Sequence, residues 1–146
     1  MVYNYRIKRE PIDEMPVTSC ITPQQAYEYA MNHCYKKEDM WQETAYVIFL
    51  DKCKNISGHA ELAKGGTDKV ILDKKVVAYY AVAAMADSII IVHNHPSGNC
   101  IPSKNDIRQT EDIHKGLKLL DIDTTDHIII SDNAFFSFKE ETQILL

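Results

Sequence analysis

Three apolar runs predict the buried strands of a sheet. The segments 44–50, 88–92 and 125–130 are largely apolar and rich in β-branched residues, so neither face of these strands suits solvent. We therefore expect them to lie inside a sheet that is covered on both faces. A shorter segment, 134–138, is expected to pair beside 125–130.

Two weaker patterns predict strands at the margins of this sheet. Apolar and polar residues alternate over 3–8, which is typical of an edge strand. The segments 56–63 and 68–72 are predicted to form a hairpin-like pair around Gly65-Gly66, because glycine favours turns.

Three segments carry apolar residues at helical spacing, namely 23–34, 74–86 and 105–120. The first has a clear start, since Thr22 is a preferred N-cap residue and Pro23 suits the first helical position. Helices interspersed with strands in this way predict an α/β (α+β) fold, in which a mixed β-sheet is flanked by helices.

Length and composition predict one compact domain. The 146 residues are 45% hydrophobic and 25% charged, which is ordinary for a globular protein. We expect residues 1–40 to form an N-terminal extension, a strand plus a helix, packed on a core domain of residues 41–146. The formal net charge of −5 provides no overall attraction to nucleic acid.

The cysteines favour a reducing compartment. Cys20, Cys34, Cys53 and Cys100 show no C-x-x-C spacing, and no secretory leader precedes them. The apolar runs are far shorter than the ~20 residues that a membrane span needs. The sequence therefore predicts a cytoplasmic protein without a membrane partner.

Two histidines one residue apart follow the strand 88–92. Side chains two positions apart in an extended chain point the same way, so His93 and His95 are expected to share a face. Pro96 ends the strand, and Ser103 is predicted to cap the next helix, which places Asp106 in its first turn. Two imidazoles and a carboxylate at one point are typical ligands of a catalytic zinc ion.

Each part of this pattern also has a simpler interpretation. A His-x-His pair often occurs without a metal, and Ser103 and Asp106 could merely form a capping box. A capping box is compatible with a metal site, because it would fix the turn that directs Asp106. Farther along, His127 could donate to a backbone carbonyl, or Asp126 could brace a ligand histidine.

The metal loop resembles the JAMM motif of the MPN/JAB1 metalloprotease fold, and specifically its RadC branch. The likeness lies in His93-Asn94-His95-Pro96-Ser97-Gly98, followed by Pro102-Ser103 and Asp106. Further segments that resemble the family are Glu43 to Asp51, Gly66-Thr67 and Asp126 to Ile130. The resemblance covers roughly residues 43–138.

The resemblance implies an MPN/JAB1-like fold with the three-layer architecture of cytidine deaminases. It also implies one zinc ion, held by His93, His95 and Asp106, that lowers the pKa of a water from about 15.7 toward 7. Glu43 would take the proton of that water, and Ser103 would donate a hydrogen bond to the tetrahedral oxyanion. The expected activity is hydrolysis of a peptide or isopeptide bond in a peptide or protein substrate.

The chain departs from the RadC pattern in two places. RadC-like proteins often carry Pro-Arg-Glu where this chain has Val70 to Lys75, and many have a helical module like helix-hairpin-helix DNA-binding units, for which residues 1–40 are too few. The alternative function is a non-catalytic zinc-containing module in DNA repair or maintenance, or on a mobile element. Nucleic acid would then be the partner, and a homo-oligomer is compatible with either function. The His-x-Glu and Pro-Cys-x-x-Cys strings of nucleobase deaminases do not occur.

Overall fold

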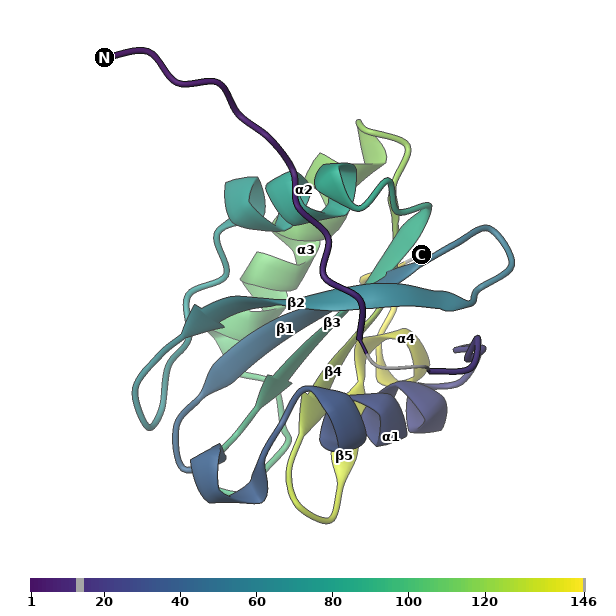
Figure 1. The fold of residues 1–146 in the computed structure, drawn as a ribbon. Coiled ribbons are helices and arrows are strands. Elements are labelled where there is room, and N and C mark those ends of the chain that lie inside the picture. Colours follow the sequence, from purple (N-terminus) through teal and green to yellow (C-terminus); the bar gives the residue numbers. More distant parts are fainter. Residues whose placement is uncertain (13–14, 146) are drawn as a thin grey trace.

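A computed structural model describes residues 1–12 and 15–145, and the strands in this part of the chain form one five-stranded sheet (Figure 1). Their order is β2-β1-β3-β4-β5. The neighbours β3 and β4 are parallel, and the other neighbouring pairs are antiparallel. The bounds are Thr44–Leu50 (β1), Ile56–Lys64 (β2), Ser88–Asn94 (β3), Asp123–Ile130 (β4) and Phe135–Ser137 (β5). The predicted mixed sheet is thus confirmed, including the pairing of β5 beside β4.

Helices cover both faces of the sheet, which gives the molecule three layers. Figure 1 shows α2 and α3 on one face and α1 and α4 on the other. The bounds are Pro23–His33 (α1), Lys74–Ala83 (α2), Lys104–Lys118 (α3) and Phe138–Glu141 (α4), with a short 3-10 turn, η1, over Lys37–Asp39. Within residues 1–12 and 15–145, no helix combines the length and the apolar character that a membrane crossing requires.

Alternate residues of the inner strands enter two separate cores. In β1, Val47 and Phe49 pack in the core on the side of α2 and α3, whereas Ile48 and Leu50 pack in the core on the side of α1. All four side chains are buried. Burial on both faces explains why β1 and the middle of β3 are almost continuously apolar and do not alternate with polar residues.

The strand directions bring three distant segments to one end of the sheet. β1 is antiparallel to β3, so β1 begins where β3 ends, and Ala45 lies opposite His93. The crossover from β3 to the parallel strand β4 runs through α3, whose first turn therefore lies near the end of β3. Glu43, His93 and Asp106 thereby meet, although about sixty residues of sequence separate the first from the last.

Both predicted helix caps are confirmed. The Thr22 hydroxyl accepts from the backbone N–H of Gln25, whose side chain in turn accepts from the N-cap backbone. The Ser103 hydroxyl accepts from the backbone N–H of Asp106, and the Asp106 carboxylate accepts from the backbone N–H of Ser103. Each capping box satisfies two of the amides that a helix N-terminus leaves without partners.

The predictions of strands at the margins of the sheet are wrong for two segments. Segment 3–8 forms no strand, and its residues are exposed, so the alternation there buries nothing. Segment 68–72 also forms no strand; β2 pairs with the long inner strand β1 instead. Val70 and Leu72 are nevertheless buried, because the segment carries them into the core beside α2.

Two boundaries are also informative. The helix predicted over 74–86 ends at Ala83, and Met85, with a φ of 52°, turns the chain away from helical geometry. At the other end, α1 packs on the sheet through Ala26 and Ala30. The division between residues 1–40 and 41–146 stays a prediction.

Candidate metal centre

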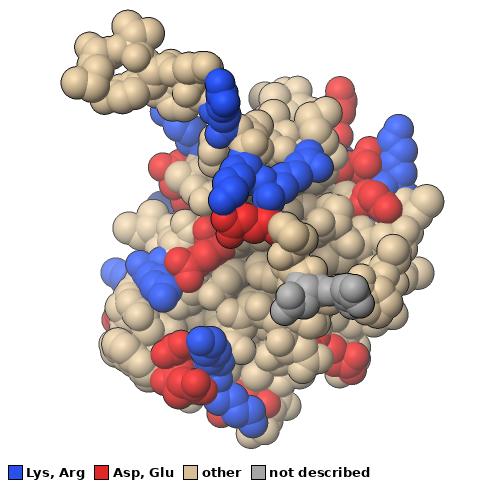
Figure 2. All heavy atoms as spheres, viewed as in Figure 1, with Lys and Arg blue, Asp and Glu red and all other residues tan. Residues whose placement is uncertain are grey.

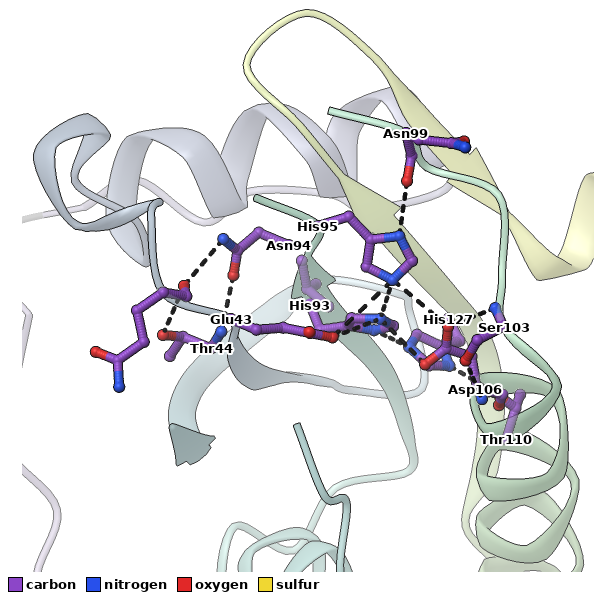
Figure 3. Close-up of polar contacts among 12 residues, drawn as sticks. Glu43, Thr44, His93, Asn94, His95, Asn99, Ser103, Asp106, Thr110 and His127 are labelled. Carbon is purple, nitrogen blue, oxygen red and sulfur yellow. Dashed lines mark hydrogen bonds and ion pairs between the residues drawn. The ribbon is translucent and has the colours of Figure 1, made fainter. Parts of the chain in front are cut away.

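Four side chains converge at the end of the sheet where β1 starts and β3 ends (Figure 3). They are Glu43, His93, His95 and Asp106, and the potential ligand atoms they offer lie within 4.8 Å of one another. Three of them are buried, whereas His95 is partly exposed. The group combines the two histidines and the aspartate predicted as ligands with the glutamate predicted as base; these roles stay predictions.

The distances place Asp106 closest to the two imidazoles. The Nε2 atoms of His93 and His95 lie 3.0 Å apart. One oxygen of Asp106 lies 3.4 Å from Nε2 of His93, and its other oxygen lies 3.4 Å from Nε2 of His95. Glu43 is slightly farther, with Oε1 at 3.6 Å and 4.0 Å from the same two nitrogens.

The contacts of His95 show which of its nitrogens faces the centre. Its Nδ1 lies 2.7 Å from the backbone carbonyl oxygen of Asn99 (Figure 3). A carbonyl oxygen can only accept, so Nδ1 carries the hydrogen and Nε2 of the neutral ring presents a lone pair. That lone pair meets His93 and the Asp106 carboxylate, an arrangement of nitrogen and oxygen donors that fits a divalent transition-metal ion.

The electrostatics of the centre follow from burial and from the close contacts. Burial raises the pKa of the Glu43 carboxyl to about 7. Burial opposes the charging of Asp106 and His95, but the hydrogen bonds that the imidazoles donate to the carboxylate when they are protonated outweigh it. The pKa of Asp106 is therefore lowered and that of His95 raised, whereas burial lowers the pKa of His93. A cation placed among these donors would offset the repulsion between the two carboxylates.

Asn94, between the two histidines, braces the backbone around Glu43. Its side chain is fully buried and points away from the imidazoles. Its amide oxygen accepts from the backbone N–H of Thr44 at 2.8 Å, and its amide nitrogen donates to the carbonyls of Met40 and Gln42 at 3.0 and 3.1 Å. These bonds fix the chain on both sides of Glu43.

Replacing Asn94 by Ala should therefore destabilise the fold. The Asn94→Ala variant leaves one donor and two acceptors without their partners in a largely buried place, each at a cost of about 1–3 kcal/mol if water cannot replace it. Urea unfolding should show a midpoint well below that of the wild type. A matched control is Asn99→Ala, because among residues 1–12 and 15–145 the Asn99 side chain only accepts from the exposed backbone N–H of Ile101. Equal midpoints for the two variants would contradict the bracing role.

The structure confirms Ser103 as the N-cap of α3, its catalytic role stays a prediction, and the contacts of His127 that the sequence left open are now defined. Ser103 is the exposed N-cap residue of α3, three positions from Asp106, and its hydroxyl hydrogen is free to donate because the oxygen accepts from Asp106. His127 does not bond to a backbone carbonyl; its Nε2 lies 2.7 Å from Nδ1 of His93. Asp126 points to the opposite side of β4, where it accepts from Ser137.

Comparison with known proteins assigns most of the chain to one family. Residues 20–143 match the family model described as the RadC-like JAB domain. Similar curated proteins, each named UPF0758 protein, occur in Porphyromonas gingivalis (34% identity over 135 residues), Thermotoga maritima (35% over 112) and Streptococcus thermophilus (38% over 105). These matches cover 92%, 77% and 72% of this chain but 59%, 50% and 46% of the relatives. The chain thus spans about half the length of the curated relatives it matches.

Proposed function

Because the chain belongs to the family of RadC-like JAB domains, we propose that it is a zinc-dependent hydrolase that cleaves a peptide or isopeptide bond in a protein substrate. The observation that carries the proposal is the convergence of two imidazole Nε2 atoms, the Asp106 carboxylate and the Glu43 carboxylate within 4.8 Å. Two histidines and one carboxylate are a ligand set that catalytic zinc sites use, with the fourth position left to water.

In this proposal His93, His95 and Asp106 hold one zinc ion. The bound ion supplies Lewis acidity, which lowers the pKa of a water and polarises the carbonyl to be cleaved. Glu43 is the base: its carboxylate lies beside the proposed ligands, with Oε1 3.6 Å from Nε2 of His93 and 4.0 Å from Nε2 of His95. Its raised pKa suits a group that takes a proton from water and returns it to a leaving amine near neutral pH.

Ser103 is the proposed hydrogen-bond donor to the substrate carbonyl. Its hydroxyl oxygen already accepts from the backbone N–H of Asp106, so its hydrogen is available to the oxygen of the carbonyl under attack. The same capping box also holds Asp106 in position. We place the protein in the cytoplasm, where the four free thiols would remain reduced.

The affinity for zinc should fall as the pH is lowered through the range around 7. The pKa of Glu43 lies at about 7 in the metal-free site, so Glu43 gains a proton in this range, and the raised pKa of His95 makes its ring easier to protonate. A proton must leave His95 before its Nε2 can bind, and each displaced proton weakens apparent binding by about tenfold per pH unit. Competition with a chromophoric chelator at several pH values measures this. Constant affinity between about pH 8 and pH 6 would contradict this prediction.

The test of the function joins metal analysis to a substrate screen. Protein purified without added metal should contain close to one zinc per chain, and it should cleave members of a panel of peptides and isopeptide-linked conjugates. A chelator should stop cleavage, and added zinc should restore it. A chain that takes up no metal on titration would contradict the proposal.

The alternative, a zinc-containing DNA-binding module, has weaker support. On the face shown in Figure 2, basic and acidic side chains lie intermixed, which differs from the single-sign stripe typical of nucleic-acid interfaces. Binding to duplex DNA whose log K falls steeply with log[salt] would favour the alternative, since each phosphate contact contributes a slope of about −0.9.

A further inference from the structure

We propose that His127 and Thr110 are positioning residues that fix the tautomer of His93, so that its Nε2 lone pair faces the metal centre. This inference rests on the proposed function only in taking the centre to be a metal site. Thr110 lies on α3, one turn after Asp106, and His127 lies on β4. Figure 3 shows the two side chains on the far side of His93 from Glu43.

A chain of hydrogen bonds runs from the backbone carbonyl of Asp106 through Thr110 and His127 to His93. The carbonyl sets which atom of each pair donates. The Thr110 hydroxyl oxygen lies 2.6 Å from the carbonyl oxygen of Asp106 and 2.6 Å from Nδ1 of His127. The carbonyl can only accept, so the one hydroxyl hydrogen is donated to it. The oxygen of Thr110 must then accept, and Nδ1 of His127 must carry a hydrogen.

The direction of donation between Thr110 and His127 then fixes the direction of donation between His127 and His93. A neutral imidazole carries one hydrogen, so a hydrogen on Nδ1 of the fully buried His127 ring leaves Nε2 as an acceptor. Nε2 of His127 lies 2.7 Å from Nδ1 of His93, which therefore donates. With its hydrogen on Nδ1, the neutral His93 ring keeps its lone pair on Nε2, the atom that faces His95 and Asp106.

Burial and ring stacking hold these hydrogen-bonded side chains in place. Thr110, His127 and His93 are fully buried, so solvent does not compete for these hydrogen bonds. The His127 ring stacks on Phe138, with ring centroids 4.9 Å apart and an interplanar angle of 12°. A hydrogen bond to the far nitrogen of a ligand histidine both orients the ring and selects its tautomer, and loss of such a partner typically weakens metal binding by about 10–100-fold.

The direct test is Thr110→Val, which removes the hydroxyl but keeps the shape of the side chain. Without the acceptor, His127 is expected to move its hydrogen to Nε2 and donate to His93, whose own hydrogen then moves to the metal-facing nitrogen. We expect zinc affinity, measured by chelator competition, to fall by about 10–100-fold. Thr110→Ser keeps the hydroxyl and should retain affinity near that of the wild type.

Thr124→Val is the matched control. Thr124 is also buried on β4, and its hydroxyl has no hydrogen-bond partner in the described part of the chain. The same chemical change there should leave zinc affinity unchanged. Nitrogen-15 NMR of the histidine rings adds a readout without metal: His127 should be the Nδ1–H tautomer in the wild type and the Nε2–H tautomer in Thr110→Val.

The outcomes separate this inference from the proposed function. Wild-type zinc binding with unchanged affinity in Thr110→Val, or an Nε2–H tautomer of His127 in the wild type, overturns the positioning role alone. A wild type that binds no metal overturns the proposed function, and the inference with it. Weakened binding in Thr110→Val, retained binding in Thr110→Ser and Thr124→Val, and the expected tautomers support the role.

Discussion

Glu43→Gln should lower kcat for hydrolysis by about 10²–10⁴-fold, the usual contribution of a positioned general base. The substitution keeps the size and hydrogen-bonding shape of the side chain but cannot take a proton. Zinc content should stay near that of the wild type, because His93, His95 and Asp106 are unchanged. Steady-state kinetics on a cleaved substrate and elemental analysis of the same sample together measure both quantities.

The stability of the metal-free protein gives Glu43→Gln a second signature. Burial raises the pKa of Glu43 from 4.5 to about 7, so the folded state holds its proton more tightly than the unfolded state. The contribution of this proton to the free energy of unfolding is fully present below about pH 4.5, and it is lost as the pH rises through 7. Above that range the glutamine variant should melt at a temperature equal to or higher than that of the wild type.

Two controls decide what a loss of activity means. Glu141→Gln changes an exposed carboxylate on α4 and should leave kcat unaltered. His95→Ala should remove zinc and activity together, whereas Glu43→Gln removes activity alone. If the hydrolysis rate survives both Glu43→Gln and His95→Ala, the assignment of the centre is wrong.

Asp106→Asn should reduce the zinc content from about one ion per chain to almost none. A neutral amide is a poor ligand, and the substitution removes the charge that lies 3.4 Å from both imidazoles. The amide oxygen can still accept from the backbone N–H of Ser103, as the carboxylate does at 2.7 Å. The helix cap should therefore largely survive, and thermal unfolding of the metal-free variant should stay cooperative.

Ser103→Ala is the complementary variant. It removes the hydroxyl that accepts from the backbone N–H of Asp106 and should lower the free energy of unfolding by about 0.5–2 kcal/mol. Zinc content should persist, while kcat falls if the hydroxyl assists the carbonyl under attack. Similar losses of stability in Ser103→Ala and Asp106→Asn, without a change in zinc content, would show that the pair is only a capping box.

Much of the local structure could be predicted because its causes are local. The inner strands β1, β3 and β4 follow from apolar runs, and the starts of α1 and α3 follow from Thr22 and Ser103, whose side chains bond within their own helical turn. The common face of His93 and His95 follows from the geometry of an extended strand. Segments 3–8 and 68–72 could not be judged this way, because a short alternating pattern becomes a strand only if another strand offers its edge.

The sequence by itself determined the loop that carries His93, His95 and Asp106, since the end of β3, its turn and the cap of α3 lie within fourteen residues. Only the tertiary structure decided that Glu43 faces this loop, because the antiparallel pairing of β1 with β3 sets that approach. It also decided that His127 supports His93 while Asp126 points away, which depends on the register of β4 against β3. The physical reason is the range of the forces: capping and strand geometry act between near neighbours, whereas strand order and register result from the burial of both faces of the whole sheet.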